Sequence, residues 1–251
     1  MRRLRTAILT SRTGRAAKAP IQRFLATLGY ELAPLNKSYD EFVLALVRRQ
    51  RVDVLVDVGA NQGQYARRFR DRGFAGRIIS FEPMREAFDR LASEARSEGR
   101  WAVRRVALGD HPSIAELHVA ANSVSSSLLP IGTLHVRAEP ASRYVRTESV
   151  HVSTLDNELA SEPSASRFWL KLDVQGYELS ALKGCENLLQ HFAYVYAECS
   201  FVELYKGHAL ADEIIAWLRE RGFILSGVYN LAYDRGGKAV QADFLFTRQS
   251  H

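Results

Sequence analysis

The stretch "VDVLVDVGANQGQY", residues 52–65, runs a β-branched apolar segment directly into a loop that contains two glycines. In an open α/β sheet, ligands bind beyond the carboxyl ends of the strands, and the first strand-to-helix turn offers backbone N–H groups at close range. Gly59 and Gly63 allow such an approach because they carry no Cβ. The stretch therefore predicts a ligand-binding turn after the first strand of the sheet.

The spacing of the two glycines bears on the kind of cofactor. The dinucleotide fingerprint is G-x-G-x-x-G, whereas residues 59–63 read G-x-x-x-G and follow Asp57. A pyrophosphate needs the open, tightly turned helix N-terminus of that fingerprint, but an amino-acid moiety gains from an acid at the strand end and from nearby backbone donors. A lone G-x-x-x-G can also serve only for close packing, so a second observation is needed.

The second predicted strand supplies that observation. It ends in "ISFEP", residues 79–83, and places Glu82 25 residues after Asp57, where its carboxylate can accept hydrogen bonds from both hydroxyls of a ribose. Pro83 then takes a favoured position at the start of the following helix. A third strand ends in "VALGD", residues 106–110, whose main chain suits the edge of an adenine. Together the three strand ends fit S-adenosylmethionine better than a nicotinamide cofactor.

Strand and helix patterns alternate along most of the chain. Apolar runs predict strands at 52–58, 77–82, 101–107, 168–173, 194–198, 223–228 and 243–247. Helical periodicity predicts helices at 21–28, 39–48, 63–71, 85–97, 177–189 and 209–221. This alternation predicts an α/β fold of the class I methyltransferase, Rossmann-like type, with a seven-stranded, mostly parallel sheet and a C-terminal antiparallel hairpin. The rhythm breaks between Ser113 and Leu155, where we expect a small strand-bearing insertion near the site.

Length and composition limit the class of protein. With 251 residues, 47% of them hydrophobic, the chain can bury one sizeable core. No apolar run approaches the roughly 18 residues of a membrane helix, and the N-terminal stretch lacks the apolar region of a secretory signal. We therefore expect a soluble, cytoplasmic protein. Cys185 and Cys199 stand at neither metal-ligand nor disulfide-framework spacing, and we expect buried free thiols.

The net charge of +6 is concentrated near the N-terminus. Seven basic residues and no acidic residue precede Glu31, which leaves 27 basic against 28 acidic residues in the rest of the chain. Because nucleic-acid enzymes carry positive potential over the face that meets the phosphates, we expect no nucleic-acid partner. The basic arm is either a solvated tail or an element attracted to anionic lipids at the inner membrane face, worth about 1 kcal/mol per Lys or Arg. We predict two regions, the arm with its helices at 1–50 and a methyltransferase domain at 51–251 with an insertion at about 113–155.

Seven motifs, in order along the chain, resemble those of a known family. They are "VDVGANQGQYA", "ISFEP", "VALGD", "SSSL", "STLD", "LKLDVQGYELSALKG" and "YAECS". Their combination and order resemble the FkbM family of S-adenosylmethionine-dependent methyltransferases over about Val52 to Thr247. The resemblance implies O-methylation, commonly of a sugar hydroxyl in a glycolipid or secondary metabolite, for example on a rhamnosyl or fucosyl residue. Residues 1–50 lie outside the resemblance, and it determines neither the acceptor nor the oligomeric state.

The strand ends and the resemblance together define the expected cofactor contacts. The serine-rich loop reads most simply as turn chemistry, and its match to the family implies that Ser126 or Ser127 bonds the cofactor or the acceptor. The expected cofactor-binding residues are Asp57, Gly59, Ala60, Asn61, Gly63, Tyr65, Glu82, Pro83, Ala107, Leu108, Ser126 and Asp173.

Methyl transfer to an alcohol needs a group that accepts the hydroxyl proton as the new bond forms. Asp173 ends the fourth strand and Glu198 ends the fifth, so both are expected to face the crevice above the sheet. The alternatives are that Asp173 only shapes its loop and touches the cofactor, and that Glu198 caps the following turn. His208 starts a predicted helix that could cover the pocket, and it is the third catalytic candidate. Glu178, near a helix start, is expected to cap that helix or to favour its positive end.

Two further alternatives concern a metal and a different reaction. Two carboxylates on adjacent strand ends could hold Mg²⁺ and so orient vicinal hydroxyls, although nothing in the sequence requires a metal. One alternative function is a nucleotide-cofactor dehydrogenase, which the G-x-x-x-G loop disfavours. Another is a protein that binds the cofactor without turnover, which the presence of Asp57, Glu82, Asp173 and Glu198 disfavours.

Overall fold

The computed structural model describes residues 39–163, 166–234 and 236–249, together with residues 20, 23, 24 and 27. It separates the chain into two compact units, residues 1–45 and 46–251. In the described part of the chain, no helix is long and apolar enough to cross a membrane. Most of the predicted helix at 21–28, and the basic residues between positions 2 and 18, lie outside the described residues.

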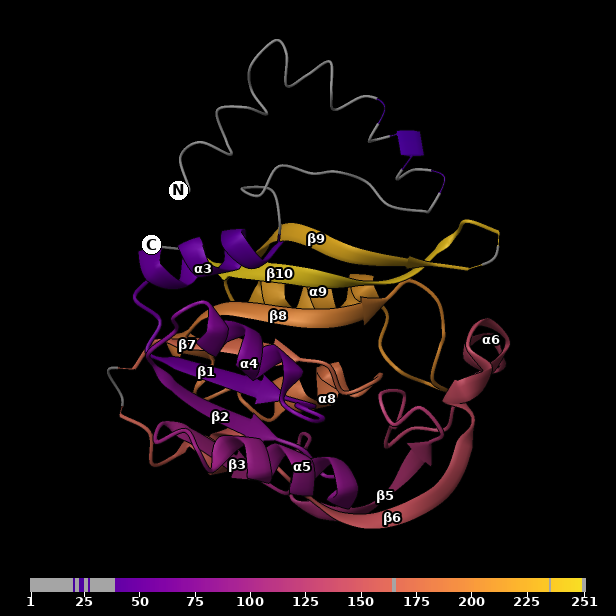
Figure 1. Cartoon of the computed structure of the whole chain (residues 1–251), viewed down its shortest axis with the longest axis horizontal. Coiled ribbons are helices and arrows are strands. Elements are labelled where there is room, and N and C mark those ends of the chain that lie inside the picture. Colours follow the sequence, from indigo (N-terminus) through magenta and orange to yellow (C-terminus); the bar gives the residue numbers. More distant parts are fainter. Residues whose placement is uncertain are drawn as a thin grey trace. The chain divides into compact units, whose positions relative to one another are not determined.

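A seven-stranded sheet forms the centre of the larger unit (Figure 1). Its strands are β1 (Val54–Val58), β2 (Arg77–Phe81), β3 (Trp101–Arg104), β7 (Phe168–Leu172), β8 (Phe192–Ser200), β9 (Phe223–Tyr233) and β10 (Ala239–Arg248). They lie in the order β3-β2-β1-β7-β8-β10-β9, and only β10 runs antiparallel to its neighbours β8 and β9. This is the class I methyltransferase fold, so the predicted mostly parallel sheet with a C-terminal antiparallel hairpin is confirmed.

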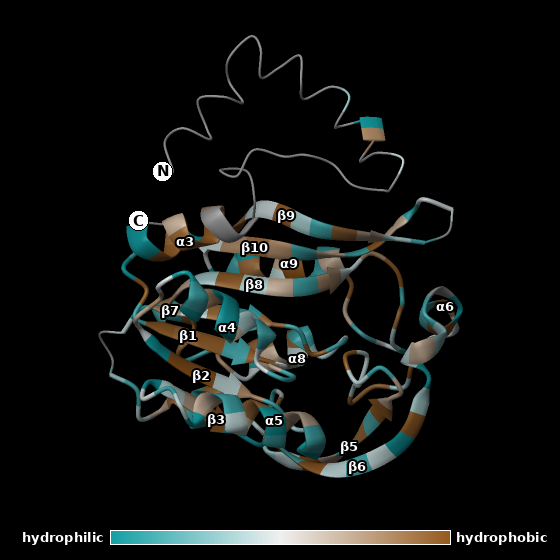
Figure 2. Ribbon diagram, in the orientation of Figure 1, coloured by the Kyte–Doolittle hydropathy of each residue, from teal (hydrophilic) through white to brown (hydrophobic). Residues whose placement is uncertain are grey.

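The central strands are apolar because the sheet is covered on both faces. Every residue of β1 and β7 is buried, and both strands are hydrophobic along most of their length (Figure 2). The helices are α3 (Tyr39–Arg49), α4 (Gln64–Asp71), α5 (Arg85–Ala95), α6 (Thr133–Ala138), α7 (Leu155–Leu159), α8 (Glu178–Lys183) and α9 (Ala211–Glu220). Helices α4 and α5 lie on one face of the sheet, and α8 and α9 lie on the other.

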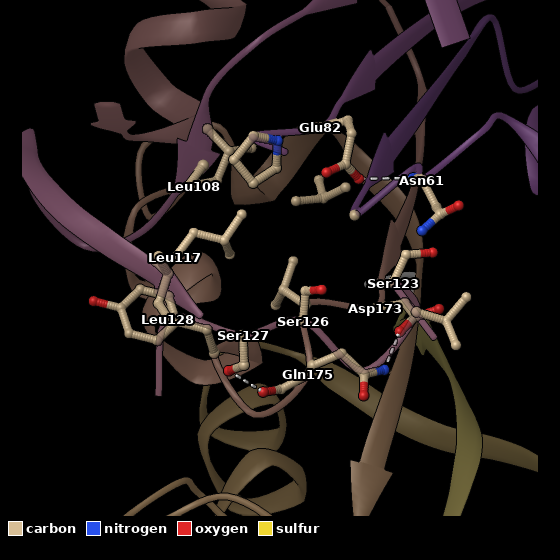
Figure 3. A pocket seen from close by; sticks show the side chains of 17 residues that line it. Asn61, Glu82, Leu108, Leu117, Ser123, Ser126, Ser127, Leu128, Asp173 and Gln175 are labelled. Carbon is tan, nitrogen blue, oxygen red and sulfur yellow. Dashed lines mark hydrogen bonds between the residues drawn. The ribbon is translucent and has the colours of Figure 1, made fainter. Parts of the chain in front are cut away.

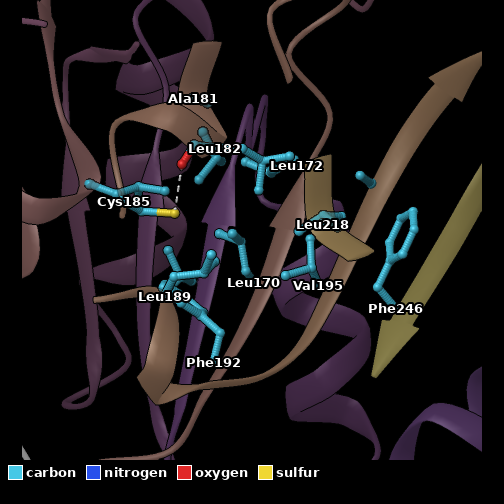
Figure 4. Close-up of a cluster of buried hydrophobic side chains, with 14 of the residues drawn as sticks. Leu170, Leu172, Ala181, Leu182, Cys185, Leu189, Phe192, Val195, Leu218 and Phe246 are labelled. Carbon is cyan, nitrogen blue, oxygen red and sulfur yellow. Dashed lines mark hydrogen bonds between the residues drawn. The ribbon is translucent and has the colours of Figure 1, made fainter. Parts of the chain in front are cut away.

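Side chains alternate between the two faces along each strand, and this alternation builds two different layers. Toward α8 and α9, Leu170 and Leu172 of β7 pack in an apolar cluster with Leu182 and Leu218 (Figure 4). Trp169, which directly precedes Leu170 in β7, faces α4. Its indole N–H donates a 3.0 Å hydrogen bond to the hydroxyl of Tyr65. The α4 face therefore accommodates polar atoms, whereas the other face is purely apolar around β7.

The predicted insertion is present as a second, three-stranded sheet. Its strands are β4 (Ala107–Leu108), β5 (Ser113–Ala120) and β6 (Tyr144–Ser153), in the order β4-β6-β5. A small core joins this sheet to the start of α5, and its buried members are Met84, Ala87, Ala107, Leu117, Val119, Val150 and Val152. The insertion is thereby fixed beside the carboxyl end of β2.

Several predicted elements differ from the observed ones, and the hairpin strands predicted at 223–228 and 243–247 extend over Phe223–Tyr233 and Ala239–Arg248. The third strand, predicted at 101–107, ends at Arg104, and Ala107 and Leu108 pair with β6 of the small sheet instead. The helix predicted at 177–189 ends at Lys183. Its C-cap is Gly184, where a Cβ would come 2.0 Å from the carbonyl oxygen of Gly109. Residues Leu189–His191 then form a separate short 3₁₀ helix.

Candidate active site

A cavity opens at the carboxyl ends of β1, β2 and β7 (Figure 3). Strand β1 pairs with β2 on one side and with β7 on the other, which is the point in an open α/β sheet where ligands bind. The cavity holds about 680 Å³ of space when the part open to solvent is included. The serine-rich loop of the insertion, with Ser123, Ser126 and Ser127, forms the wall opposite the strand ends.

Most of the expected cofactor residues lie on the wall of this cavity. Those that line it are Gly59, Asn61, Glu82, Pro83, Ala107, Leu108, Ser126 and Asp173. The residues Asp57, Ala60, Gly63 and Tyr65 do not line it. Tyr65 points into the core, where its ring stacks on Tyr196 at 6.0 Å between centroids. Its expected contact with the cofactor is therefore not supported by its position.

The two glycines of the loop serve packing as well as ligand approach. Gly59 has φ +73°, and a Cβ there would come 1.8 Å from the carbonyl oxygen of Asp173. Gly63 has φ +85°, and a Cβ there would come 2.9 Å from side-chain atoms of Leu91 and Trp101. Gly63 thus permits close packing of α4 on α5 and β3, whereas Gly59 brings two loops together at the cavity wall.

Glu82 follows β2 and is held by backbone donors. Its Oε2 accepts a 2.8 Å hydrogen bond from the N–H of Asn61, and its Oε1 accepts one of 2.8 Å from the N–H of Met84. Burial, with only 6% of the residue exposed, raises its pKa to about 7, although the two backbone donors act in the opposite direction. A carboxylate has about four acceptor sites, so Glu82 retains acceptor capacity for the hydroxyls of a ribose at the cavity wall.

Lys171 joins the end of β1 to the end of β7. Its ammonium donates a 2.9 Å hydrogen bond to the carbonyl of Gly59, and it lies 3.3 Å from Oδ1 of Asp57 and 3.5 Å from Oδ2 of Asp173. Burial raises the pKa of Asp57, and the charge of Lys171 is the largest effect in the opposite direction. For Lys171 burial lowers the pKa, but the neighbouring charges of Asp173 and Asp57 outweigh it and the net pKa is raised.

Gln175 connects the two expected catalytic carboxylates. Its Nε2 donates 2.7 Å hydrogen bonds to Oδ1 of Asp173 and to Oε2 of Glu198, while the hydroxyl of Tyr205 donates to its Oε1 at 2.6 Å. The second oxygen of Glu198 accepts a 2.8 Å bond from Nε2 of Gln241. Asp173 lines the cavity with 39% of its side chain exposed, whereas Glu198 lies behind Gln175.

The electrostatic environment of Glu198 favours its protonated form. Burial is the largest cause, and the neighbouring carboxylates of Asp173, Glu178 and Asp243 raise the pKa of Glu198 further. Lys171 is the cation that partly offsets these charges. The two carboxylates on Gln175 are therefore unequal, because Asp173 contacts both the lysine and the cavity.

His208 and Glu178 support the backbone. Nε2 of His208 accepts a 3.1 Å hydrogen bond from the N–H of Leu204, the residue precedes α9, and burial lowers its pKa. His208 does not line the cavity, so the structure does not bring it to the other two catalytic candidates. Oε1 of Glu178 accepts hydrogen bonds from the N–H groups of Val174 and Gly176, at 3.0 and 3.2 Å, as expected of a capping residue.

Sequence reasoning missed Lys171, Gln175 and Gln241. A lysine inside the apolar run "FWLKLD" was a usable signal, because a buried charge in a central strand needs a partner. Gln241 carried no such signal, since it reaches Glu198 only through the pairing of β10 with β8. Within residues 39–163, 166–234 and 236–249, no group of three or more His, Cys, Asp or Glu side chains is placed to hold a metal ion.

Solved structures of methyltransferases are among those to which this chain is similar. An rRNA methylase from Streptococcus thermophilus has a TM-score of 0.43 at 11% identity, covering 79% of this chain and 88% of that one. The 23S rRNA methyltransferase ErmE has a TM-score of 0.43 at 10% identity, covering 84% and 68%.

Two curated proteins are similar in sequence. The hexuronic acid methyltransferase AglP of Haloferax volcanii is 26% identical over 230 residues, which cover 88% of this chain and 89% of that protein. The 2-O-methyltransferase NoeI of Sinorhizobium fredii is 27% identical over 161 residues, which cover 61% and 66%. Residues 57–225 match the family model of the methyltransferase FkbM domain. The chain therefore belongs to the FkbM methyltransferase family, and the protein is a methyltransferase.

Proposed function

We propose that this enzyme transfers a methyl group from S-adenosylmethionine to a hydroxyl group of a sugar. The observation that carries the proposal is one cavity with Glu82 on its wall at the end of β2 and the pair Asp173 and Gln175 at the end of β7. Family membership favours methyl transfer over the dehydrogenase alternative. The names of two relatives, a hexuronic acid methyltransferase and a 2-O-methyltransferase, support a sugar hydroxyl as acceptor.

The cofactor would be held by groups that already line the cavity. The carboxylate of Glu82 would accept hydrogen bonds from the ribose, and the main chain of Ala107 and Leu108 would flank the adenine. Gly59 and Asn61 would approach the amino-acid moiety through their backbone. Bound there, S-adenosylmethionine supplies an electrophilic methyl group.

Asp173 is the residue best placed to accept the proton of the acceptor hydroxyl. Its carboxylate faces the cavity, while Gln175 and Lys171 fix its two oxygens from behind. A positioned general base contributes roughly 10²- to 10⁴-fold to the rate. Glu198, with its raised pKa, stabilises the amide of Gln175 and so acts on Asp173 indirectly. No step in this proposal requires a metal ion.

The acceptor would be a sugar residue of a glycolipid or secondary metabolite, for example a rhamnosyl or fucosyl residue. It would approach Asp173 within the cavity, whose wall also includes Ser123, Ser126 and Ser127 of the serine-rich loop.

The first experiment is calorimetric titration of the enzyme with S-adenosylmethionine, S-adenosylhomocysteine and NAD, followed by assays on deoxysugar and uronic acid glycosides. We expect binding of the first two ligands, no binding of NAD, and a mass increase of one methylene group on a glycoside. Binding of NAD alone would refute the proposal. Cofactor binding with methylation of a non-sugar hydroxyl would refute only its acceptor.

We propose a cytoplasmic location in which the basic arm attracts the enzyme to an anionic membrane that presents a lipid-linked acceptor. Seven basic residues without an acidic one precede Glu31, and this charge supports the idea. Deletion of residues 1–18 should abolish co-sedimentation with phosphatidylglycerol vesicles at low salt. Equal co-sedimentation of the shortened and full-length chains would contradict it.

A further inference from the structure

A row of polar side chains crosses the sheet on the face that meets α4. The register pairs Ser80 of β2 with Asp57 of β1, Asp57 with Lys171 of β7, and Lys171 with Tyr196 of β8. The other residues of β1 are all apolar, and Lys171 is the only charged residue in β7. A buried ion pair is seldom more stabilising than apolar side chains of the same size, so this pair calls for an explanation beyond stability.

Lys171 touches both loops that form the cavity wall. Its ammonium holds the carbonyl of Gly59, in the loop after β1, and lies within 3.5 Å of the carboxylate of Asp173, in the loop after β7. The same two loops meet through the backbone, where the N–H of Asp173 donates to the carbonyl of Val58 at 3.1 Å. The lysine therefore adds a link between a backbone group on one loop and a side chain on the other.

We propose that Lys171 is a positioning residue for methyl transfer, which fixes the carbonyl of Gly59 and the carboxylate of Asp173 relative to each other. This inference rests on the proposed function, because that function assigns Gly59 to the cofactor and Asp173 to the acceptor. A compact ammonium with three donors suits three acceptors that lie in different directions, which a planar guanidinium does not. Asp57 completes the arrangement as the counter-charge from β1.

The groups around the ammonium keep it charged. Asp57 faces it from β1, Asp173 from the loop after β7, Glu198 from β8, and the ring of Tyr65 from α4 at 5.8 Å. Asp57 and Asp173 thus lie within ion-pair distance of one cation. Lys171 acts as a permanent link and not as a switch that changes near neutral pH.

The competing explanation is that Lys171 only neutralises Asp57. Lys171→Met alone would leave that carboxylate buried without a counter-charge and could prevent folding. The informative comparison is therefore between Asp57→Asn and the double variant Asp57→Asn/Lys171→Met, because neither carries an unpaired buried carboxylate at position 57. We expect similar melting temperatures, but about tenfold weaker binding of S-adenosylhomocysteine and about tenfold lower kcat at saturating S-adenosylmethionine in the double variant. Equal affinity and equal kcat would overturn the proposal.

Three further variants make the test sharper. Lys171→Arg keeps the charge, so the fold should persist while kcat falls, and a wild-type kcat in Lys171→Arg would show that charge alone is needed. In the Asp57→Asn background, adding Lys171→Met should lower kcat less when Asp173→Asn is also present than when Asp173 is intact, because the lysine acts through Asp173; equal factors would contradict that route. Lys183→Met, an exposed lysine in α8, is the matched control and should behave as wild type.

The binding comparison separates this inference from the proposed function. Titration with S-adenosylhomocysteine needs no acceptor, so it tests Lys171 even when no glycoside is methylated. A wild-type enzyme that binds S-adenosylhomocysteine but methylates no sugar would refute the proposed acceptor, and the affinities of the variants would still decide the role of Lys171.

Discussion

The two sides of the cavity hold their carboxylates in different ways. On the cofactor side, Glu82 accepts hydrogen bonds from the backbone N–H groups of Asn61 and Met84. On the acceptor side, Asp173 and Glu198 share the side-chain amide of Gln175. Backbone donors are fixed by the path of the chain, whereas side-chain amides depend on residue identity.

This difference indicates on which side of the cavity single substitutions can change activity. Any substitution that preserves the loops after β1 and β2 leaves the two backbone donors to Glu82 in place, so the cofactor side is robust. Replacing Gln175 would remove a bond to each of two carboxylates without changing the fold of β7 or β8. We infer that the acceptor side is where specificity and rate respond to single side chains, and single substitutions on each side can test this contrast.

The largest effect is expected for Asp173→Asn on the acceptor side. Asparagine keeps the size of the side chain but cannot accept a proton, so kcat should fall about 100- to 10,000-fold, while the affinity for S-adenosylmethionine stays near that of wild type. Steady-state kinetics and calorimetric titration measure the two quantities. Asp212→Asn, an exposed position at the start of α9, is the control. An unchanged kcat would remove Asp173 from the role of base.

Gly59→Ala tests the point where the two sides touch. The new Cβ would meet the carbonyl of Asp173 in a left-handed backbone conformation, so the free energy of unfolding should fall by about 3 kcal/mol. Gly73→Ala is the matched control, because Gly73 has φ +86° but a Cβ added there would have no atom within 4 Å, and this variant should lose only about 1 kcal/mol. Urea denaturation measures both. Equal losses would mean that the loops are not in close contact.

The same contrast explains which parts of the site were predictable from sequence. The cofactor side is built from short contiguous segments, so the glycine loop and Glu82 could be recognised and placed on one cavity. Tyr65 was expected at the cofactor, but the loop pattern does not say which way the first turn of a helix faces, and here its hydroxyl accepts a hydrogen bond from Trp169 in the core. The central strands β1 and β7 were predictable because their runs are largely apolar, whereas the third strand ends at Arg104 and not at 107.

The acceptor side depends on contacts between residues far apart in the sequence. Gln175 and Gln241 reach Glu198 across 23 and 43 positions, and no local pattern marks either pair. His208 was expected at the pocket because it follows Glu198 and precedes a helix. In the structure α9 begins only at Ala211, and the imidazole of His208 accepts a hydrogen bond from the N–H of Leu204. Such tertiary contacts decide which polar residue faces a cavity.

A smaller effect is expected for Glu82→Ala on the cofactor side. Loss of the acceptor for the ribose hydroxyls should weaken S-adenosylmethionine binding about 10- to 100-fold, with kcat at saturating cofactor little changed. Calorimetric titration gives the affinity, and Glu86→Ala, an exposed glutamate in the same region, is the control. A large loss of kcat at saturation would contradict the division between the two sides.

The smallest effect, a change in stability with pH, is expected for Glu178→Gln. This variant tests whether the acceptor side also contains a carboxylate that is held by backbone N–H groups, as Glu82 is on the cofactor side. Glu178 accepts from the N–H groups of Val174 and Gly176, and burial raises its pKa to about 7 from 4.5. Because the folded-state pKa is the higher one, its contribution to stability is complete below about pH 4.5 and is lost as the pH rises through about 7.

The glutamine variant keeps both hydrogen bonds but does not ionise. Wild type should therefore lose stability relative to Glu178→Gln as the pH rises from 5 to 8, by about 1 kcal/mol in the free energy of unfolding. The full pKa shift from 4.5 to about 7 would set an upper limit of about 3 kcal/mol. Urea denaturation at the two pH values measures this, with the exposed Glu220→Gln as control. If the difference in stability between Glu178→Gln and wild type is the same at both pH values, folding does not raise the pKa of Glu178. Backbone donors would then stabilise a buried carboxylate fully, and the raised pKa of Glu82 on the cofactor side would need the same revision.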